Sequence, residues 1–376
     1  MSFNYPPNSK IIATGSIPKA AHRDSNLELF RVIVMLMIIA HHYVVNSGLI
    51  QRLLDSPMTP SSSAMLVFGA WGKTGINCFV LITGYFMCTS SITLRKFLKL
   101  YLQIVFWAVV VYFILCTAGL ADFSYWVLFK RIAVVYSLPF RDFVSAFLVF
   151  YLCIPFLNIL IHNMTQNVHL TLIILLVSIY SVMPCIGVNI EFNYIEWFSI
   201  LYIIAAYLRL YDIDKIFTHT QWGYFTLAFL LIAIASIISI EYVSKNNILN
   251  VWVYYFVIDS NKIFALSVSI FSFMWFKTLK IGYSKFINML GASTFGVLLI
   301  HAHSDEMRQW LWGNTVDCVG HFNESVLYTV GYGLASILVI FTVCSAIETM
   351  RIKIIEKPML DFFEYKVIHP MKNDCP

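Results

Sequence analysis

Long apolar stretches recur along almost the whole chain, and this feature most constrains its fold. A helix needs about 20 apolar residues to cross the roughly 30 Å hydrocarbon core of a membrane. Stretches of that length predict ten transmembrane helices, at residues 29–48, 64–88, 98–119, 143–162, 168–187, 193–210, 222–241, 255–276, 286–303 and 325–347. The predicted fold class is therefore all-α, a polytopic membrane helical bundle.

The composition supports the same class. Of the 376 residues, 59% are hydrophobic and 12% are charged, whereas soluble domains carry about 25% charged residues. Soluble enzymes, DNA-binding modules and disulfide scaffolds are thereby excluded. The net charge of +5 is not interpreted as nucleic-acid binding, and membrane lipids are the expected surroundings.

The basic residues predict which way the bundle faces. An even number of spans places both termini on one side, and Lys and Arg concentrate on the cytoplasmic side of membrane proteins. Most of the 25 Lys and Arg residues fall on the side that holds both termini. We therefore expect cytoplasmic termini in a multi-pass protein of the cell (plasma or inner) membrane. The predicted organisation is a polar segment (1–27), a ten-helix membrane domain (28–348) and a cytoplasmic tail (349–376).

The first predicted span contains three ionisable residues, Arg31, His41 and His42. Such residues are costly inside a membrane and usually face a cavity or a partner. Arg31 and His42 are eleven positions apart, about three helical turns and 16 Å, so they share one face. His41 projects from another face. The alternative is an arginine that extends to the membrane surface and a histidine that bonds a neighbouring carbonyl.

Other intramembrane polar residues are predicted at the depth of His42. His301 lies about 15 residues into the ninth span, and Lys73 and Asn77 lie one turn apart in the second. The alternative for His301 and for Lys73 is a purely structural role. Asp259 and Lys262 are spaced i, i+3, which favours a pair with each other.

A basic group begins the third span, where Arg95, Lys99 and Gln103 share a face and Lys96 is adjacent. With Arg31, these residues would form a cationic rim suited to the phosphates of a nucleotide-containing cofactor. The alternative is the ordinary enrichment of basic residues on the cytoplasmic side.

Two polar outer segments and the cysteines complete the pattern. Residues 122–139 are expected to form an amphipathic helix along the outer interface. Residues 304–324, which include Arg308, form the most polar outer loop, and the alternatives for this loop are contact with a substrate or a solvated cap. Most cysteines lie in or beside spans and are interpreted as packing residues. A disulfide between Cys185 and Cys318 is the less favoured alternative.

Familiar catalytic motifs are missing, including GxSxG, the P-loop, HExxH and zinc-spaced Cys/His clusters. Metal and phosphotransfer chemistry are therefore disfavoured, and no metal is expected. A histidine-centred membrane site with a cationic entrance remains, and it suits general-base activation of a hydroxyl.

The residues also resemble a known family. The segment NLELFRVIVMLMIIAHHYV is similar to the opening of the acyltransferase-3 family of integral-membrane acyltransferases, in which an Arg and a His stand eleven apart. The resemblance continues through FVLITGYFM, SAFLVFYLCIPFLN, STFGVLLIHAH and IIEKPML, and is strongest for the branch that modifies bacterial exopolysaccharides. Departures are Thr83 for a frequent Ser, Leu298 for a common Tyr, and Arg95, Lys96 and Lys99 in place of Arg-x-Arg.

The resemblance implies transfer of an acyl group, usually acetyl, from cytoplasmic acyl-CoA to a hydroxyl of a surface glycan or its lipid-linked precursor. His42, Arg31 and His301 are the implied catalytic residues, with Arg31, Arg95, Lys96 and Lys99 on acetyl-CoA. Lys73, Asn77 and His41 are the candidate substrate-binding residues. A transporter or flippase for a glycan intermediate is the main alternative, and a scaffold in polysaccharide assembly is another.

Overall fold

The chain is described by a computed structural model that covers residues 24–134, 143–248 and 251–363. Every regular element in these residues is helical. Residues 1–23 of the predicted polar segment, 135–139 of the predicted interfacial helix and 364–376 of the predicted tail lie outside this part.

Most of the α-helices follow the predicted apolar stretches. Their bounds are α1 Ser25–Val45, α2 Leu49–Asp55, α3 Pro60–Gly69, α4 Gly72–Met87, α5 Leu94–Thr117, α6 Tyr125–Ile132, α7 Phe143–His162, α8 Gln166–Val177, α9 Met183–Cys185, α10 Tyr194–Leu210, α11 His219–Lys245, α12 Ile263–Thr278, α13 Lys285–His301, α14 Asp305–Arg308, α15 Val326–Arg351 and α16 Lys357–Phe363. Short π-helices are η2 Ser178–Val182, η4 Gln309–Thr315 and η5 Ile352–Glu356, and η3 Ile213–Lys215 is a 3₁₀ turn. Helix α12 begins eight residues after the predicted start at 255, and the stretch 64–88 is divided between α3 and α4.

Seven helical stretches in the described residues are long and apolar enough to cross a membrane. An eighth is formed if α13 is counted together with α14 and η4, which turn away from it by 98°. Helices α10 and α12 are shorter, with 17 and 16 residues. The polytopic all-α class is confirmed, whereas the count of ten spans stays a prediction.

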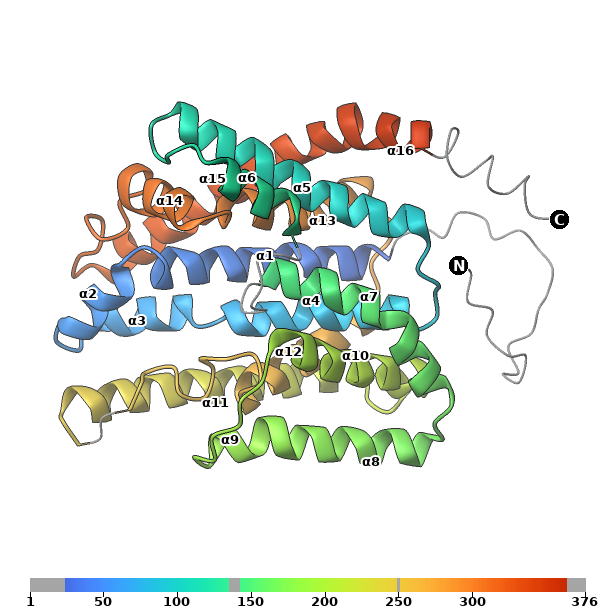
Figure 1. The fold of residues 1–376 in the computed structure, drawn as a ribbon. Coiled ribbons are helices and arrows are strands. Elements are labelled where there is room, and N and C mark those ends of the chain that lie inside the picture. The colour runs from blue at the N-terminus through green and yellow to red at the C-terminus, as the bar shows by residue number, and fades with distance from the viewer. Residues whose placement is uncertain (1–23, 135–142, 249–250, 364–376) are drawn as a thin grey trace.

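Helix α1 lies in the middle of the bundle, packed between α13, α4, α3 and α15 (Figure 1). Glycines allow some of these close approaches. A Cβ on Gly75 of α4 would lie 2.7 Å from Ile38 of α1, and one on Gly84 would lie 2.8 Å from Ala205 of α10. Such small residues let membrane helices pack closely. The polar residues of α1 consequently have protein around them rather than lipid.

The start of α1 and helix α16 lie at the same end of the bundle (Figure 1). We call this the α1-start end, and the opposite end, which carries α2 and α14, the α14 end. Which end is cytoplasmic stays a prediction. Residues 349–363, assigned from sequence to the tail, are helical and continue α15 through η5 into α16.

The structure tests the alternative Cys185–Cys318 disulfide and the predicted Asp259–Lys262 pair. Cys185 and Cys318 are both free thiols. The predicted pair between Asp259 and Lys262 is wrong, because the Asp259 carboxylate lies 3.4 Å from the ammonium of Lys73. Lys262 instead donates to the carbonyl of Pro184 and lies over the ring of Tyr255.

Candidate active site

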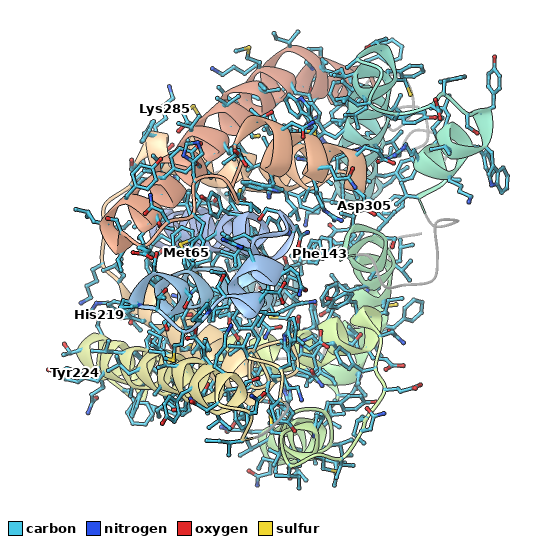
Figure 2. All side chains as sticks on the ribbon, turned by 90° about the vertical axis from the view of Figure 1, so that its left-hand side faces the viewer. Met65, Phe143, His219, Tyr224, Lys285 and Asp305 are labelled. Carbon is cyan, nitrogen blue, oxygen red and sulfur yellow. The ribbon has the colours of Figure 1, made fainter. Side chains whose placement is uncertain are left out.

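A cavity of about 730 Å³ opens beside α1, between α4, α5, α6 and α13. Its polar lining residues are His41, His42, Asn46, Lys73, Lys130, Arg131, Tyr194, His303 and Arg308. Figure 2, which views the bundle from the α14 end, labels Phe143, also on the cavity wall, and Asp305, near Arg308. The volume is in the range of small-molecule and cofactor sites.

His42 and His301 meet at the wall of this cavity. The Nδ1 atom of His42 lies 3.1 Å from Nε2 of His301, and the ring centroids are 5.1 Å apart. His42 lines the cavity, whereas His301 is fully buried behind it, with the indole of Trp312 edge-on to its ring. The structure thus brings together two residues that are 259 positions apart in the chain.

The hydrogen bonds of His301 determine where the protons sit. Its Nδ1 lies 2.6 Å from the carbonyl oxygen of Val297, one turn back in α13. A carbonyl can only accept, so Nδ1 of His301 carries the hydrogen, and Nε2 of a neutral His301 is an acceptor. His42 must then donate from Nδ1, which leaves its Nε2 with an unshared electron pair. This is the tautomer that a general base requires.

His41 and Lys73 also line the cavity. The Nδ1 atom of His41 donates to the carbonyl of Gly69 at 2.7 Å. The Lys73 ammonium donates to the hydroxyl of Tyr194 at 2.6 Å and is paired with Asp259. Both side chains are therefore held in fixed positions on the wall next to His42.

Asn77 lies elsewhere. It is buried and outside the described lining of the cavity. Its side chain donates to the carbonyl of Ser260 at 2.7 Å and accepts from the indole N–H of Trp197 at 2.9 Å. Asn77 thus joins α4 to α10 and to the segment before α12.

Arg31 is not among the described cavity residues. It lies about three turns nearer the start of α1 than His42, with its guanidinium 3.9 Å from the carboxylate of Glu28. The shared helical face predicted for Arg31 and His42 therefore leads to two separate places, with only His42 on the cavity wall.

The predicted basic group at the start of α5 forms ion pairs with the C-terminal helices. Lys99 lies 2.8 Å from the carboxylate of Glu356, and Arg95 lies 3.5 Å from that of Asp361. Lys96 donates to the carbonyl of Ser91. The start of α5 and helix α16 lie at the α1-start end (Figure 1).

A buried carboxylate cluster was missed from sequence. It consists of Gln103, Trp107, Glu348, Arg351 and Glu356, all of them buried. Glu348 accepts from Gln103 at 2.9 Å, from Trp107 at 2.7 Å and twice from Arg351. Arg351 also pairs with Glu356 at 2.5 Å. The signal was present in the i, i+3 spacing of Glu348 and Arg351, which lie one and four residues beyond the predicted last span.

Among the cations of the outer segments, Lys130 and Arg131 were not foreseen as site residues, and Arg308 was considered only as part of the polar outer loop. Lys130 and Arg131 of α6 and Arg308 of α14 all line the cavity. The guanidinium of Arg131 lies over the ring of Tyr112 and 3.1 Å from Nε2 of His303. Burial lowers the pKa of Arg131 from its usual value, and the nearby Glu306 opposes that shift.

Comparison with known proteins gives the family. The sequence model of one family, described as an acyltransferase domain, matches residues 24–345, which include every described residue of the cavity. The search of curated proteins and the search of solved structures gave no match. The match covers far more than half of the chain and agrees with the helical membrane fold. The chain belongs to the acyltransferase-3 family and is a membrane acyltransferase.

Proposed function

We propose that this acyltransferase moves an acyl group, acetyl in the simplest case, from cytoplasmic acyl-CoA to a hydroxyl of a surface polysaccharide or of its lipid-linked precursor. The observation that carries the proposal is the His42–His301 pair on the cavity wall, with Nε2 of His42 available as a base. The expected location is the cell membrane.

In the proposed reaction, Nε2 of His42 takes the proton of the acceptor hydroxyl while its oxygen attacks the thioester carbonyl carbon. The tetrahedral intermediate then expels the CoA sulfur, which receives the proton from His42. An ester forms and a thioester breaks, with no net change in protons on the enzyme. Direct transfer from donor to acceptor is preferred over an acyl-histidine intermediate.

His301 has a positioning role in this scheme. Because it accepts from Nδ1 of His42, it holds the ring orientation and keeps the electron pair on Nε2. When His42 becomes an imidazolium, Nδ1–H still donates to the same acceptor. His301 thus supports both protonation states of the base, as the third member of a catalytic triad does.

The donor is proposed to bind through Arg31, Arg95, Lys96 and Lys99 at the α1-start end. Lys99 and Arg95 are about half exposed, at 48% and 44% of their side chains. Asp361, the partner of Arg95, is also exposed, at 72%. Exposed ion pairs contribute only about 0–1 kcal/mol, so a phosphate can replace Asp361 at little cost. His41 and Lys73 are proposed to contact the acceptor in the cavity, and Asn77 to act indirectly through the position of α4.

Replacing His301 tests the positioning role. We expect His301→Ala to lower kcat by about 100-fold, because His42 loses the acceptor that fixes its tautomer, while KM for acetyl-CoA changes less than about twofold. His301→Gln supplies an amide oxygen in place of Nε2 and should recover part of kcat. The measurement is steady-state transfer by the purified protein in lipid vesicles. An unchanged kcat in His301→Ala would remove His301 from the mechanism.

The function itself is tested with radiolabelled acetyl-CoA. Membranes that contain the protein, supplied with labelled acetyl-CoA and host polysaccharide, should incorporate label into the glycan as base-labile ester. A glycan transporter would leave the glycan unlabelled in open membrane fragments, where no barrier to transport exists. If the protein were only a scaffold, the glycan would still be labelled in its absence once the partner enzymes are supplied.

A further inference from the structure

We propose that the acceptor carries a negative charge, and that Lys130, Arg131 and Arg308, here called the cationic arc, bind it in the cavity. The inference rests on the proposed function insofar as the acceptor hydroxyl must reach His42. It adds the chemical class of the acceptor and assigns it a binding site on α6 and α14.

Helix α6 has an aromatic face at the protein surface and a cationic face at the cavity. Tyr125, Trp126, Phe129 and Ile132 are exposed at its surface, where aromatic side chains suit a membrane interface. Residues on the other face, Val127, Lys130 and Arg131, line the cavity at helical spacings of three and four. A surface helix usually directs its cations to water or lipid headgroups, whereas α6 directs both of its cations to the wall of an internal site.

The charges on the cavity wall are all of one sign. Lys73, Lys130, Arg131 and Arg308 line the cavity, and its described lining contains no Asp or Glu. Acidic groups stand outside this lining, and they are exposed: Glu306 is near Arg131, Asp305, paired with Arg308, is 83% exposed, and Asp259, paired with Lys73, is 45% exposed. Such exposed pairs neutralise a cation weakly, so an anion inside the cavity meets a net positive potential.

Each of the two arginines also has a buried N–H donor that makes no hydrogen bond within the described residues. These donors are the Nε atoms of Arg131 and Arg308. Lys130 makes a cation–π contact with Trp126. Buried donors without acceptors are costly, and a carboxylate or phosphate oxygen is the acceptor that arginine binds most strongly.

Carboxylate and phosphate share this chemistry and have two sources in a glycan acceptor. A carboxylate comes with an acidic sugar, and a phosphate comes with the diphosphate that joins a glycan to its lipid carrier. Both position a neighbouring sugar hydroxyl next to His42, because His42 and the cationic arc line the same cavity.

The test measures binding of three soluble probes to the full-length protein in detergent, with glucuronate, inorganic pyrophosphate and glucose in separate titrations. We expect glucuronate or pyrophosphate to raise the melting temperature and glucose to leave it unchanged. Arg131→Gln combined with Arg308→Gln should weaken the anion affinity at least tenfold. Lys130→Gln should weaken it less, because the ammonium of Lys130 already has a cation–π contact with Trp126. Lys285→Gln, an exposed cation at the start of α13 (Figure 2), is the matched control.

The outcomes separate the sources and the hypotheses. Binding of glucuronate alone indicates an acidic sugar, and binding of pyrophosphate alone indicates the lipid diphosphate. The inference fails if neither anion binds, if the arc variants bind as the unaltered protein does, or if acetyl-CoA displaces the anion competitively, since the anion would then occupy the donor site. Absence of acyl transfer to glycan in the labelling assay would refute the proposed function, independently of the binding result.

Discussion

Replacing His42 with alanine is expected to lower acyl transfer by about 10²–10⁴-fold, the range that a general base contributes, while the protein continues to accumulate in the membrane. The ring of His42 lies at the cavity wall and bonds His301, whereas His41 and His303, which also line the cavity, each bond a backbone carbonyl. His41 also keeps Nε2 free, because its Nδ1 donates to the carbonyl of Gly69, but its bond is to the backbone and not to a second imidazole.

Labelled acetyl-CoA and polysaccharide measure the loss, with immunoblotting of membranes to compare protein levels. His321→Ala is the matched control, because His321 is on the outer segment, stacked on Tyr332, and lies outside the described cavity lining. Transfer by His42→Ala at the rate of the unaltered protein would exclude His42 as the base.

Replacing Glu348 with alanine is expected to be the most destabilising single change, at about 3–5 kcal/mol. Glu348 is fully buried and accepts from Gln103, Trp107 and Arg351. Its removal leaves the buried guanidinium of Arg351 with only Glu356, and leaves two further donors unpaired. Thermal unfolding of the detergent-solubilised protein should show a melting temperature lower by about 10 °C.

Two comparisons make that measurement specific. Lys99→Ala breaks an ion pair whose lysine is about half exposed, and should cost at most about 1 kcal/mol. A double variant, Glu348→Ala with Arg351→Met, removes both buried charges and should recover part of the loss, as expected for coupled residues. Strictly additive losses would mean that the two residues do not stabilise each other.

The sequence predicts where the long helices lie and how far along its helix each residue is. The apolar stretches located the long helices, and counting residues from the helix starts placed His42 and His301 at one level, where the structure pairs them. Depth says nothing about rotation relative to neighbours. Asn77 shares a helix with Lys73, yet it bonds Trp197 instead of facing the cavity, because the packing of α4 on α10 fixes which face is covered.

Charged residues near helix ends were the hardest to interpret. Arg95 and Lys99 fit a cofactor rim by composition, but their partners Asp361 and Glu356 come from more than 250 positions away. Lys130, Arg131 and Arg308 resembled ordinary residues of outer segments, because only the tertiary fold turns α6 and α14 onto the cavity. Local spacing cannot reveal such pairings, since they depend on how distant helices pack.

The two histidines and the cationic arc are carried by different kinds of element. His42 and His301 are on α1 and α13, long helices packed against each other in the bundle, while Lys130, Arg131 and Arg308 are on α6 and α14, helices of eight and four residues. Acceptor binding and base catalysis can therefore be altered separately by protein engineering. Exchanging α6 and α14 for the corresponding helices of a relative should change which acceptor is preferred. The position of His42 should stay the same, because neither helix carries it.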